Sequence, residues 1–143
     1  MSQNIKKNSI GFLLVEVLLA LMLFSILVMV VVEVLLSGQE AARTGGLRAQ
    51  ATFLAEEGQE AVRNIRDSSY LNLADGTYGL SITNSQWQLS GSPDQTGIFT
   101  RQVNVSSPMP NVKEINVTVT WQQTATREGT TTLDSYLTNW HGN

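Results

Sequence analysis

Apolar and polar positions divide the first third of the chain into a short polar leader and a long apolar run. Residues 1–11 are mostly polar, whereas residues 12–36 are almost all Leu, Val, Met, Ile and Phe, with Glu16 and Glu33 as the only charges. As an α-helix, the 21 residues from Phe12 to Val32 span about 31 Å. This length matches a hydrocarbon core of roughly 30 Å. The pattern therefore predicts a membrane-spanning helix over residues 12–36, with Glu33 at its outer end.

The apolar run differs from a cleaved secretory signal. It is far longer than the usual apolar region of about 7–15 residues, and no small-x-small cleavage site closes it. Lys6 and Lys7 precede the run, and the next basic residue after it is Arg43. By the positive-inside rule, this asymmetry places the N-terminus in the cytoplasm. The sequence predicts a retained single-pass anchor.

Helical periodicity continues beyond the apolar run. No proline occurs before Pro93, so we expect one long helix over Phe12–Arg66, weakest at Gly45-Gly46 and ended by Asp67-Ser68-Ser69. Residues 37–67 form its amphipathic half. Their apolar stripe has spacings of three and four residues and needs a partner surface: Leu47, Ala51, Leu54, Gly58, Val62 and Ile65.

The period changes from 3.6 to 2 after residue 68. Alternating segments predict strands over residues 75–83, 85–91, 97–107, 114–121 and 130–140, with turns at Asn84-Ser85 and at Arg127-Glu128-Gly129. The expected inward-facing residues are Val103, Val105, Ile115, Val117, Val119, Trp121, Leu133 and Leu137. Short strands joined by compact turns predict an antiparallel sheet. The fold class is therefore α+β, with a long N-terminal helix packed on a small sheet head over residues 68–143.

Composition excludes several classes of function. The chain has no cysteine, so it has neither disulfides nor thiolate metal sites, and its single histidine excludes a multi-histidine cage. The net charge of −3 gives no reason to expect nucleic-acid binding. No nucleotide loop, hydrolase motif or pair of catalytic acids is present. We expect no enzymatic activity, no cofactor and no metal.

Three further groups have an ordinary interpretation and a functional alternative. Glu56, Glu57 and Glu60 fit a solvated helix face better than a metal cluster, because no companion ligands follow. His141 lies near the C-terminus without an acid or nucleophile in a recognisable arrangement. The tryptophans are expected in the core of the small sheet, and a sugar-binding platform is the alternative: Trp87, Trp121 and Trp140.

The N-terminal pattern resembles that of a known family. Lysines in a short leader, then Gly11-Phe12, three residues, Glu16 and about twenty apolar residues resemble type IV pilins and type II secretion pseudopilins. The match is closest to minor PilV-like pilins and pseudopilin I. It covers residues 6–36, and the remainder matches only in architecture. Ile10 stands where a basic residue is usual, and the helix proline and cysteine pair of many major pilins are absent. The last two departures favour a minor component.

The resemblance implies a processing pathway. A prepilin peptidase would cut after Gly11 on the cytoplasmic side, removing the leader 1–11, and would methylate the new amino group of Phe12. The Glu16 carboxylate would then meet the Phe12 ammonium of a neighbouring subunit. That pairing offsets the cost of both charges in an apolar medium and sets the axial register. The alternative is a Glu16 that is protonated, or paired with its own Phe12 amine, without a role in assembly.

The function implied is structural. The chain would be an inner-membrane precursor that an assembly platform builds into a type IV pilus or a type II secretion pseudopilus, by helix packing with other subunits. Its mature form would lie in a cell-surface or periplasmic filament. The alternatives are a major pilin, or a single-pass protein in the lipid whose head is a binding module for adhesion or DNA uptake. The few basic residues of the head argue against DNA: Arg101, Lys113 and Arg127.

Overall fold

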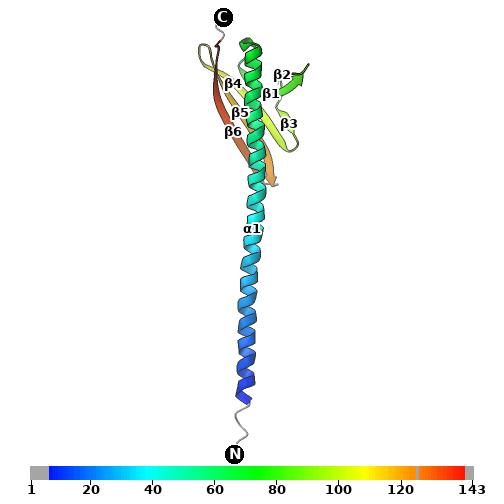
Figure 1. Cartoon of the computed structure of the whole chain (residues 1–143), viewed down its shortest axis with the longest axis vertical. Helices are drawn as coiled ribbons and strands as arrows, with labels where there is room; N and C mark the ends of the chain where they lie inside the picture. The colour runs from blue at the N-terminus through cyan, green and yellow to red at the C-terminus, as the bar shows by residue number, and fades with distance from the viewer. Residues whose placement is uncertain (1–6, 125, 141–143) are drawn as a thin grey trace, which may run out of the picture. The chain divides into compact units, whose positions relative to one another are not determined.

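The structure, a computed structural model, describes residues 7–124 and 126–140 and has one long helix and an antiparallel sheet (Figure 1). The elements are α1 (Lys7–Ser68), the 3₁₀ turn η1 (Tyr70–Asn72), β1 (Gly76–Thr83), β2 (Gln86–Ser90), β3 (Asp94–Thr96), β4 (Phe99–Met109), β5 (Val112–Thr124) and β6 (Arg127–Thr138). Two compact units divide between Arg43 and Thr44. Within the second unit, the last part of α1 packs on the sheet, which confirms the predicted α+β class.

Helix α1 is continuous, as predicted, and passes through Gly45-Gly46 without a break. It begins at Lys7 rather than at Phe12 because each residue added to an existing helix gains a hydrogen bond without a new nucleation step. Its apolar stretch is long enough to cross a membrane, as an anchor or as a signal sequence. Lys6 and His141 lie outside the described residues.

The strand order is β2-β1-β4-β5-β6, and β3 pairs with β4 beside β1. Strand β1 has two partners: Gly76–Tyr78 pair with β4, and Gly79–Thr83 pair with β2. At the change of partner, a Cβ on Gly79 would lie 2.0 Å from the carbonyl oxygen of Ser92, so only glycine fits there. Asn84 and Ser85 both have positive φ, which confirms the turn predicted there.

The core lies between α1 and the inner face of the sheet. The predicted helix stripe is confirmed, and a Cβ on Gly58 would come 2.9 Å from Cγ1 of Val117, so helix and sheet approach closely there. The predicted inward strand residues are also confirmed, although Leu133 is only half-buried. The buried apolar residues of the two layers are Ala51, Ala55, Ala61, Val62, Ile65, Leu80, Phe99, Val103, Val105, Ile115, Val117, Val119, Trp121 and Leu137.

The strands differ from the sequence-based prediction at two places. Arg127-Glu128-Gly129 is not a turn, because β6 already begins at Arg127, which pairs with Thr124. Gly129 instead lies opposite Trp121, and a Cβ there would come 2.4 Å from the indole ring. Strand β3 was not predicted, because its three residues have no apolar alternation to reveal them.

Candidate functional site

The three residues of the predicted processing site all lie in α1. Phe12 is 74% exposed, and Glu16 is exposed one helical turn further on, so the two share a side of the helix. Glu16 forms no hydrogen bond or ion pair with any residue whose side chain the structure describes. Gly11 lies within the same helix, immediately before Phe12. The helix thus presents Phe12 and Glu16 outward, without a hydrogen-bond or ion-pair partner among the described side chains.

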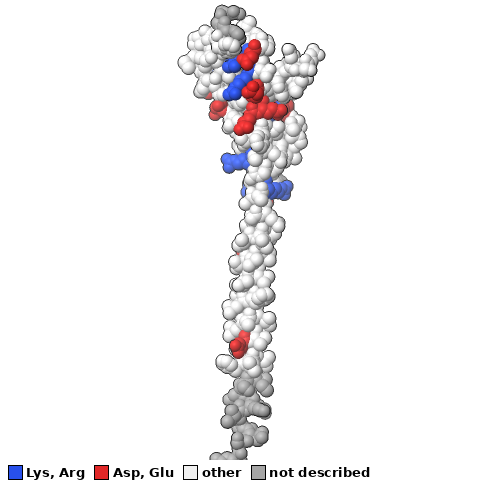
Figure 2. Space-filling model, in the orientation of Figure 1, with Lys and Arg blue, Asp and Glu red and all other residues white. Residues whose placement is uncertain are grey.

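The apolar stretch of α1 is uncovered by its own chain. Every residue from Phe12 to Leu36 is exposed, and between Glu16 and Glu33 none is charged (Figure 2). Exposed apolar surface of this extent is unfavourable in water at about 25 cal/mol per Å². Lipid or other apolar helices would remove this surface from water.

Ser25 and Ala20 are the small residues within this stretch. The Ser25 hydroxyl donates a hydrogen bond to the Leu21 carbonyl oxygen of its own helix at 2.7 Å. The polar atom is therefore satisfied locally and needs no water or neighbouring chain. Small side chains at these two positions permit another helix to approach closely.

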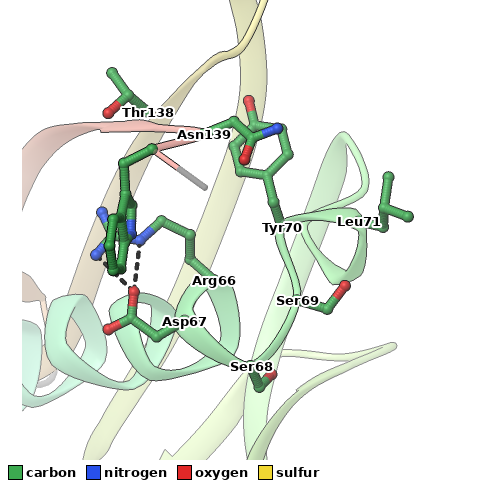
Figure 3. A pocket seen from close by; sticks show the side chains of 9 residues that line it. Arg66, Asp67, Ser68, Ser69, Tyr70, Leu71, Thr138 and Asn139 are labelled. Atoms are coloured by element: carbon green, nitrogen blue, oxygen red, sulfur yellow. Dashed lines mark hydrogen bonds and ion pairs between the residues drawn. The ribbon is translucent and has the colours of Figure 1, made fainter. Parts of the chain in front are cut away.

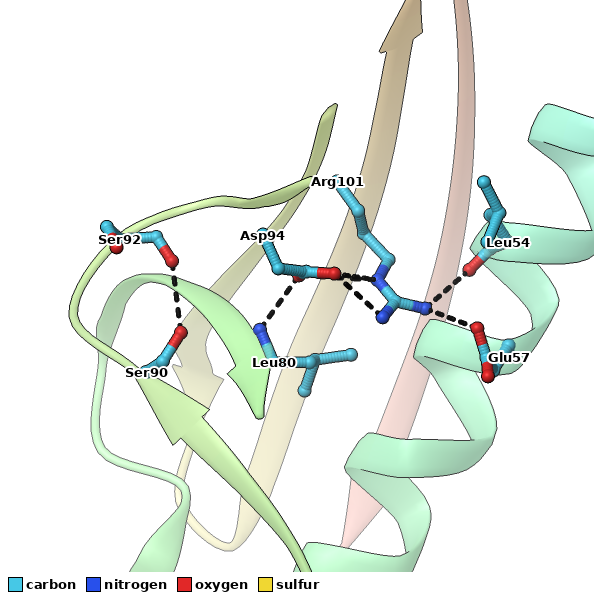
Figure 4. A network of polar contacts seen from close by, with 7 residues as sticks. All are labelled: Leu54, Glu57, Leu80, Ser90, Ser92, Asp94 and Arg101. Atoms are coloured by element: carbon cyan, nitrogen blue, oxygen red, sulfur yellow. Dashed lines mark hydrogen bonds and ion pairs between the residues drawn. The ribbon is translucent and has the colours of Figure 1, made fainter. Parts of the chain in front are cut away.

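A buried arginine organises the head (Figure 4). Arg101 is only 6% exposed. Its Nη2 donates to the Asp94 carboxylate at 2.8 Å, and its Nη1 donates to the Glu57 carboxylate at 2.9 Å and to the Leu54 carbonyl oxygen at 3.0 Å. The guanidinium also lies 6.0 Å from the ring centroid of Trp87. One side chain on β4 thus connects β3, α1 and β2.

Asp94 also accepts a hydrogen bond from the backbone of β1. Its Oδ1 accepts a hydrogen bond from the Leu80 backbone N–H at 2.8 Å, just where β1 leaves β4 for β2. The carboxylate therefore replaces a ladder hydrogen bond that the sheet does not supply. Sequence reasoning counted Arg101 as a surface cation and missed this cluster. A signal was present, because Arg101 occupies an inward position between Phe99 and Val103.

Gln59 is a second buried polar residue that sequence reasoning missed. Its amide donates to the carbonyl oxygens of Leu133 at 2.8 Å and Ile115 at 3.4 Å, and its oxygen accepts from the Ser135 hydroxyl. These bonds tie α1 to β5 and β6. Both buried clusters join α1 to strands of the sheet through hydrogen bonds.

The acids of α1 do not form a metal site. Glu57 binds Arg101 and is 51% exposed, and Glu60 pairs with Arg63 at 3.3 Å. Among the described residues, no group of three or more His, Asp or Glu is placed to hold a metal ion.

Hydrogen bonds on the surface of the head shift the pKa values of two residues, Asp75 and Tyr136. The Lys113 ammonium lies 2.6 Å from Oδ1 of Asp75, and this bond, helped by one from the Ser107 hydroxyl, lowers the pKa of Asp75 below its ordinary value. The Tyr136 hydroxyl donates to the Glu114 carboxylate at 3.0 Å, which raises the pKa of Tyr136.

A polar cavity of about 460 Å³ lies at the C-terminal end of α1 (Figure 3). Trp140 lines it beside the Arg66–Asp67 ion pair, whose closest N–O distance is 2.7 Å. Trp140 is 63% exposed, so the expectation that all three tryptophans lie in the core is wrong for Trp140. It is right for Trp121 and holds in part for Trp87, which packs half-buried against the core. Trp140 lies beyond the end of β6 and has no inward strand position to occupy.

Comparison of the chain with protein-family models, with characterised proteins and with solved structures gave no match. The interpretation of the site therefore depends on the residues and contacts described above.

Proposed function

We propose that the chain is a structural subunit of a thin filament, a minor pilin or pseudopilin. The observation that supports this most is Gly11-Phe12 with Glu16 at the start of an unbroken helix whose apolar surface is wholly uncovered. A plain anchor needs such a surface only for lipid, and a carboxylate within it is costly there, by roughly 2.5–3.5 kcal/mol on insertion scales. A filament of packed helices gives Glu16 a partner.

Processing supplies that partner. Cleavage after Gly11 by a prepilin peptidase leaves an amino group on Phe12, which is mostly cationic at neutral pH. In a neighbouring subunit at the correct height, the Glu16 carboxylate meets this ammonium, and neither charge remains unpaired in the apolar medium. The helices exchange lipid contacts for helix contacts, so assembly loses little apolar burial and gains the ion pair.

The charges of the head support a role without nucleic acid. Arg101 is buried, Lys113 pairs with Asp75, and Arg127 donates to the Gln123 side chain at 2.7 Å. The three Lys and Arg residues of the sheet head, residues 68–143, are thus engaged within it.

The test is the intact mass and the N-terminal residue of the protein from its native membrane, beside a Gly11→Ala variant. We expect a mature chain that starts at methylated Phe12, and an uncut variant, because a Cβ hinders entry of the backbone into a tight protease cleft. A wild-type chain that still starts at Met1 would exclude the proposal.

A second candidate function is adhesion by a membrane-anchored head. The exposed Trp140 beside a polar cavity supports it, because an aromatic face next to hydrogen-bonding groups suits a sugar. Trp140→Ala should then reduce attachment of intact cells to glycan-coated surfaces while filament number is unchanged. Equal attachment of both strains would exclude this role.

A further inference from the structure

Where α1 packs on the sheet, its outward face carries one exposed aromatic side chain, Phe53, which we call the Phe53 ridge. Phe53 is 68% exposed, on the side of the helix opposite the buried stripe. A groove of about 580 Å³ between α1 and β6 runs along one side of it, lined by Gln59 and Leu133 among others. A second groove of about 480 Å³ lies on the other side, against Leu54 and Ile98. An aromatic side chain between two grooves has the form of a docking surface.

The rim of the first groove is acidic. Glu56, Glu60 and Asp134 line it together with Arg63, and Figure 2 shows acidic side chains beside basic ones over the head. Glu60 and Asp134 already have partners, Arg63 and Asn116. Glu56 is exposed and forms no hydrogen bond or ion pair through its side chain with the described residues. The groove therefore suits an occupant that brings a positive charge.

Among the residues that the structure describes from Thr44 onward, Arg48 is the unpaired cation. Arg48 is exposed, and its guanidinium forms no hydrogen bond or ion pair with the described residues. Every other basic residue described from Thr44 onward has a side-chain partner: Arg63, Arg66, Arg101, Lys113 and Arg127. Because Arg48 and Glu56 are both unpaired on the same chain, the Arg48 of one copy can pair with the Glu56 of another copy.

The helix surface next to Arg48 also fits the ridge in shape. A Cβ added to Gly45 or to Gly46 would meet nothing within 4 Å, and Ala49 follows directly after Arg48. This stretch of α1 is therefore a low surface of backbone and small side chains. A protruding Phe53 can pack against it closely.

We propose that a second copy of this chain docks the Gly45–Arg48 stretch of its α1 on the Phe53 ridge, with its Arg48 against Glu56. The inference rests on the proposed filament function and names the head contact within it. Arg48 and Glu56 are eight residues apart, about 12 Å along the helix and roughly 80° around it. One molecule cannot pair its own Arg48 with its own Glu56. Each copy therefore has two separate surfaces, the Gly45–Arg48 stretch for one neighbour and the Phe53 ridge for the other. Such a heterologous contact repeats without closing and builds a filament of parallel, staggered subunits.

Cysteine cross-linking tests the stagger. Thr52→Cys with Glu60→Cys has the same eight-residue offset and leaves Arg48 and Glu56 in place. The natural chain has no cysteine, and two positions about 12 Å apart on one helix are too distant for a disulfide, which needs Cα atoms within about 7 Å. Every disulfide formed is therefore between copies. The control pair replaces Glu60→Cys by Gln102→Cys, on the exposed outer side of β4.

In filaments formed in the native cell, we expect mild oxidation to give a ladder of dimers, trimers and higher species for the first pair and none for the control. Processed chains in filaments without a ladder, or cross-linked only to a different subunit, would overturn the inference and leave the proposed function intact. A chain that still starts at Met1 and forms no filament would overturn both.

Charge exchange tests the pair itself in the same cross-linking background. Arg48→Glu and Glu56→Arg should each reduce the ladder about two- to fivefold, as for exposed ion pairs, and the double exchange should restore it. Glu128→Arg makes the same charge change on an exposed acid of β6 and should have no effect. Equal ladders in all four variants would overturn the assignment of Arg48 to Glu56.

Phe53→Ser separates docking from folding. Because Phe53 is largely exposed, the head should keep its melting temperature while the ladder is lost, whereas Leu71→Ser, at 89% exposure away from the ridge, should change neither. An undiminished ladder in Phe53→Ser would remove the ridge from the interface.

Discussion

Arg101 shows how a single side chain determines the packing of the head. Its guanidinium is nearly buried, so removal from water is unfavourable by several kcal/mol unless every donor finds an acceptor. Asp94, Glu57 and the Leu54 carbonyl oxygen provide them. The arrangement is stable only when β3 and α1 are both in place against β4. The cluster therefore specifies the arrangement of these elements as well as stabilising it.

Replacing Arg101 should lower the free energy of unfolding strongly, and a second substitution should restore part of it. Arg101→Met leaves the Asp94 carboxylate mostly buried and unpaired, so we expect a loss of about 3 kcal/mol in the free energy of unfolding. Adding Asp94→Asn removes that charge and keeps an acceptor for the Leu80 N–H, so much of the loss should return. Denaturant unfolding of the detergent-solubilised chain measures both, and a double variant no more stable than Arg101→Met would contradict this account.

The carboxyl of Asp75 should titrate below its ordinary pKa of 3.8 because Lys113 and Ser107 donate to it. A folded-state pKa below the unfolded value stabilises the fold above pH 3.8, and this contribution disappears as the pH falls through the lower folded value.

Lys113→Met should move the Asp75 pKa back toward 3.8, and Ser107→Ala should move it less. Carboxyl carbon shifts followed by NMR through the acid range measure both changes. An unchanged titration in Lys113→Met would show that the ammonium is not the cause.

The residues that sequence reasoning identified and missed differ in how their partners are placed. Gly11, Phe12 and Glu16 are neighbours in the chain, so their pattern is readable without a structure. The buried positions of Arg101 and Gln59 depend on hydrogen-bond partners in α1, β3 and β6 that come close to them only when the chain folds. Residue type alone gave Arg101 a surface position, and only its place in the strand alternation indicated otherwise.

Among the elements, α1 and the long strands were predictable because each has one strong period. The stripe of α1 and the alternation in β5 are set by burial on a single face. Strand β3 was not predictable, since its pairing depends on Asp94 reaching Arg101 and Leu80. Tertiary contacts, rather than local preference, create that strand.

Two glycines of α1 should respond in opposite directions to alanine. Gly46→Ala adds a Cβ in open space and gains helix propensity, so it should stabilise by about 1 kcal/mol. Gly58→Ala gains the same propensity but presses on Val117 and Arg101, at an expected penalty of about 1–3 kcal/mol. The net change should be a destabilisation of about 1 kcal/mol in denaturant unfolding. A Gly58→Ala variant as stable as Gly46→Ala would contradict the close approach of helix and sheet.

For the molecule as a whole, the proposed assembly depends on Glu16 after processing is complete. Glu16→Gln keeps the size and polarity of the side chain and removes its charge. We expect cleavage after Gly11 to be unchanged and the yield of filaments to fall at least tenfold, because a neighbour's Phe12 ammonium loses its counter-ion in an apolar medium. Mass spectrometry of the membrane pool and electron microscopy of sheared filaments give the two readouts.

Glu33→Gln is the matched control, since Glu33 lies at the expected outer end of the span and should tolerate the loss of charge. Filaments as abundant in Glu16→Gln as in the wild type would leave Glu16 with the other role considered, pairing within its own chain.

The hydrogen bond of Ser25 has a consequence for extraction from the bilayer. A hydroxyl that relied on a lipid headgroup, on water or on another helix would have to exchange partners each time the subunit moved. Because Ser25 donates to Leu21 within its own helix, that bond travels with the subunit. Between Val17 and Val32, no polar side chain of α1 depends on a hydrogen bond to lipid, water or another chain. In the proposed filament pathway, this section could therefore leave the membrane and return without exchanging a side-chain hydrogen bond.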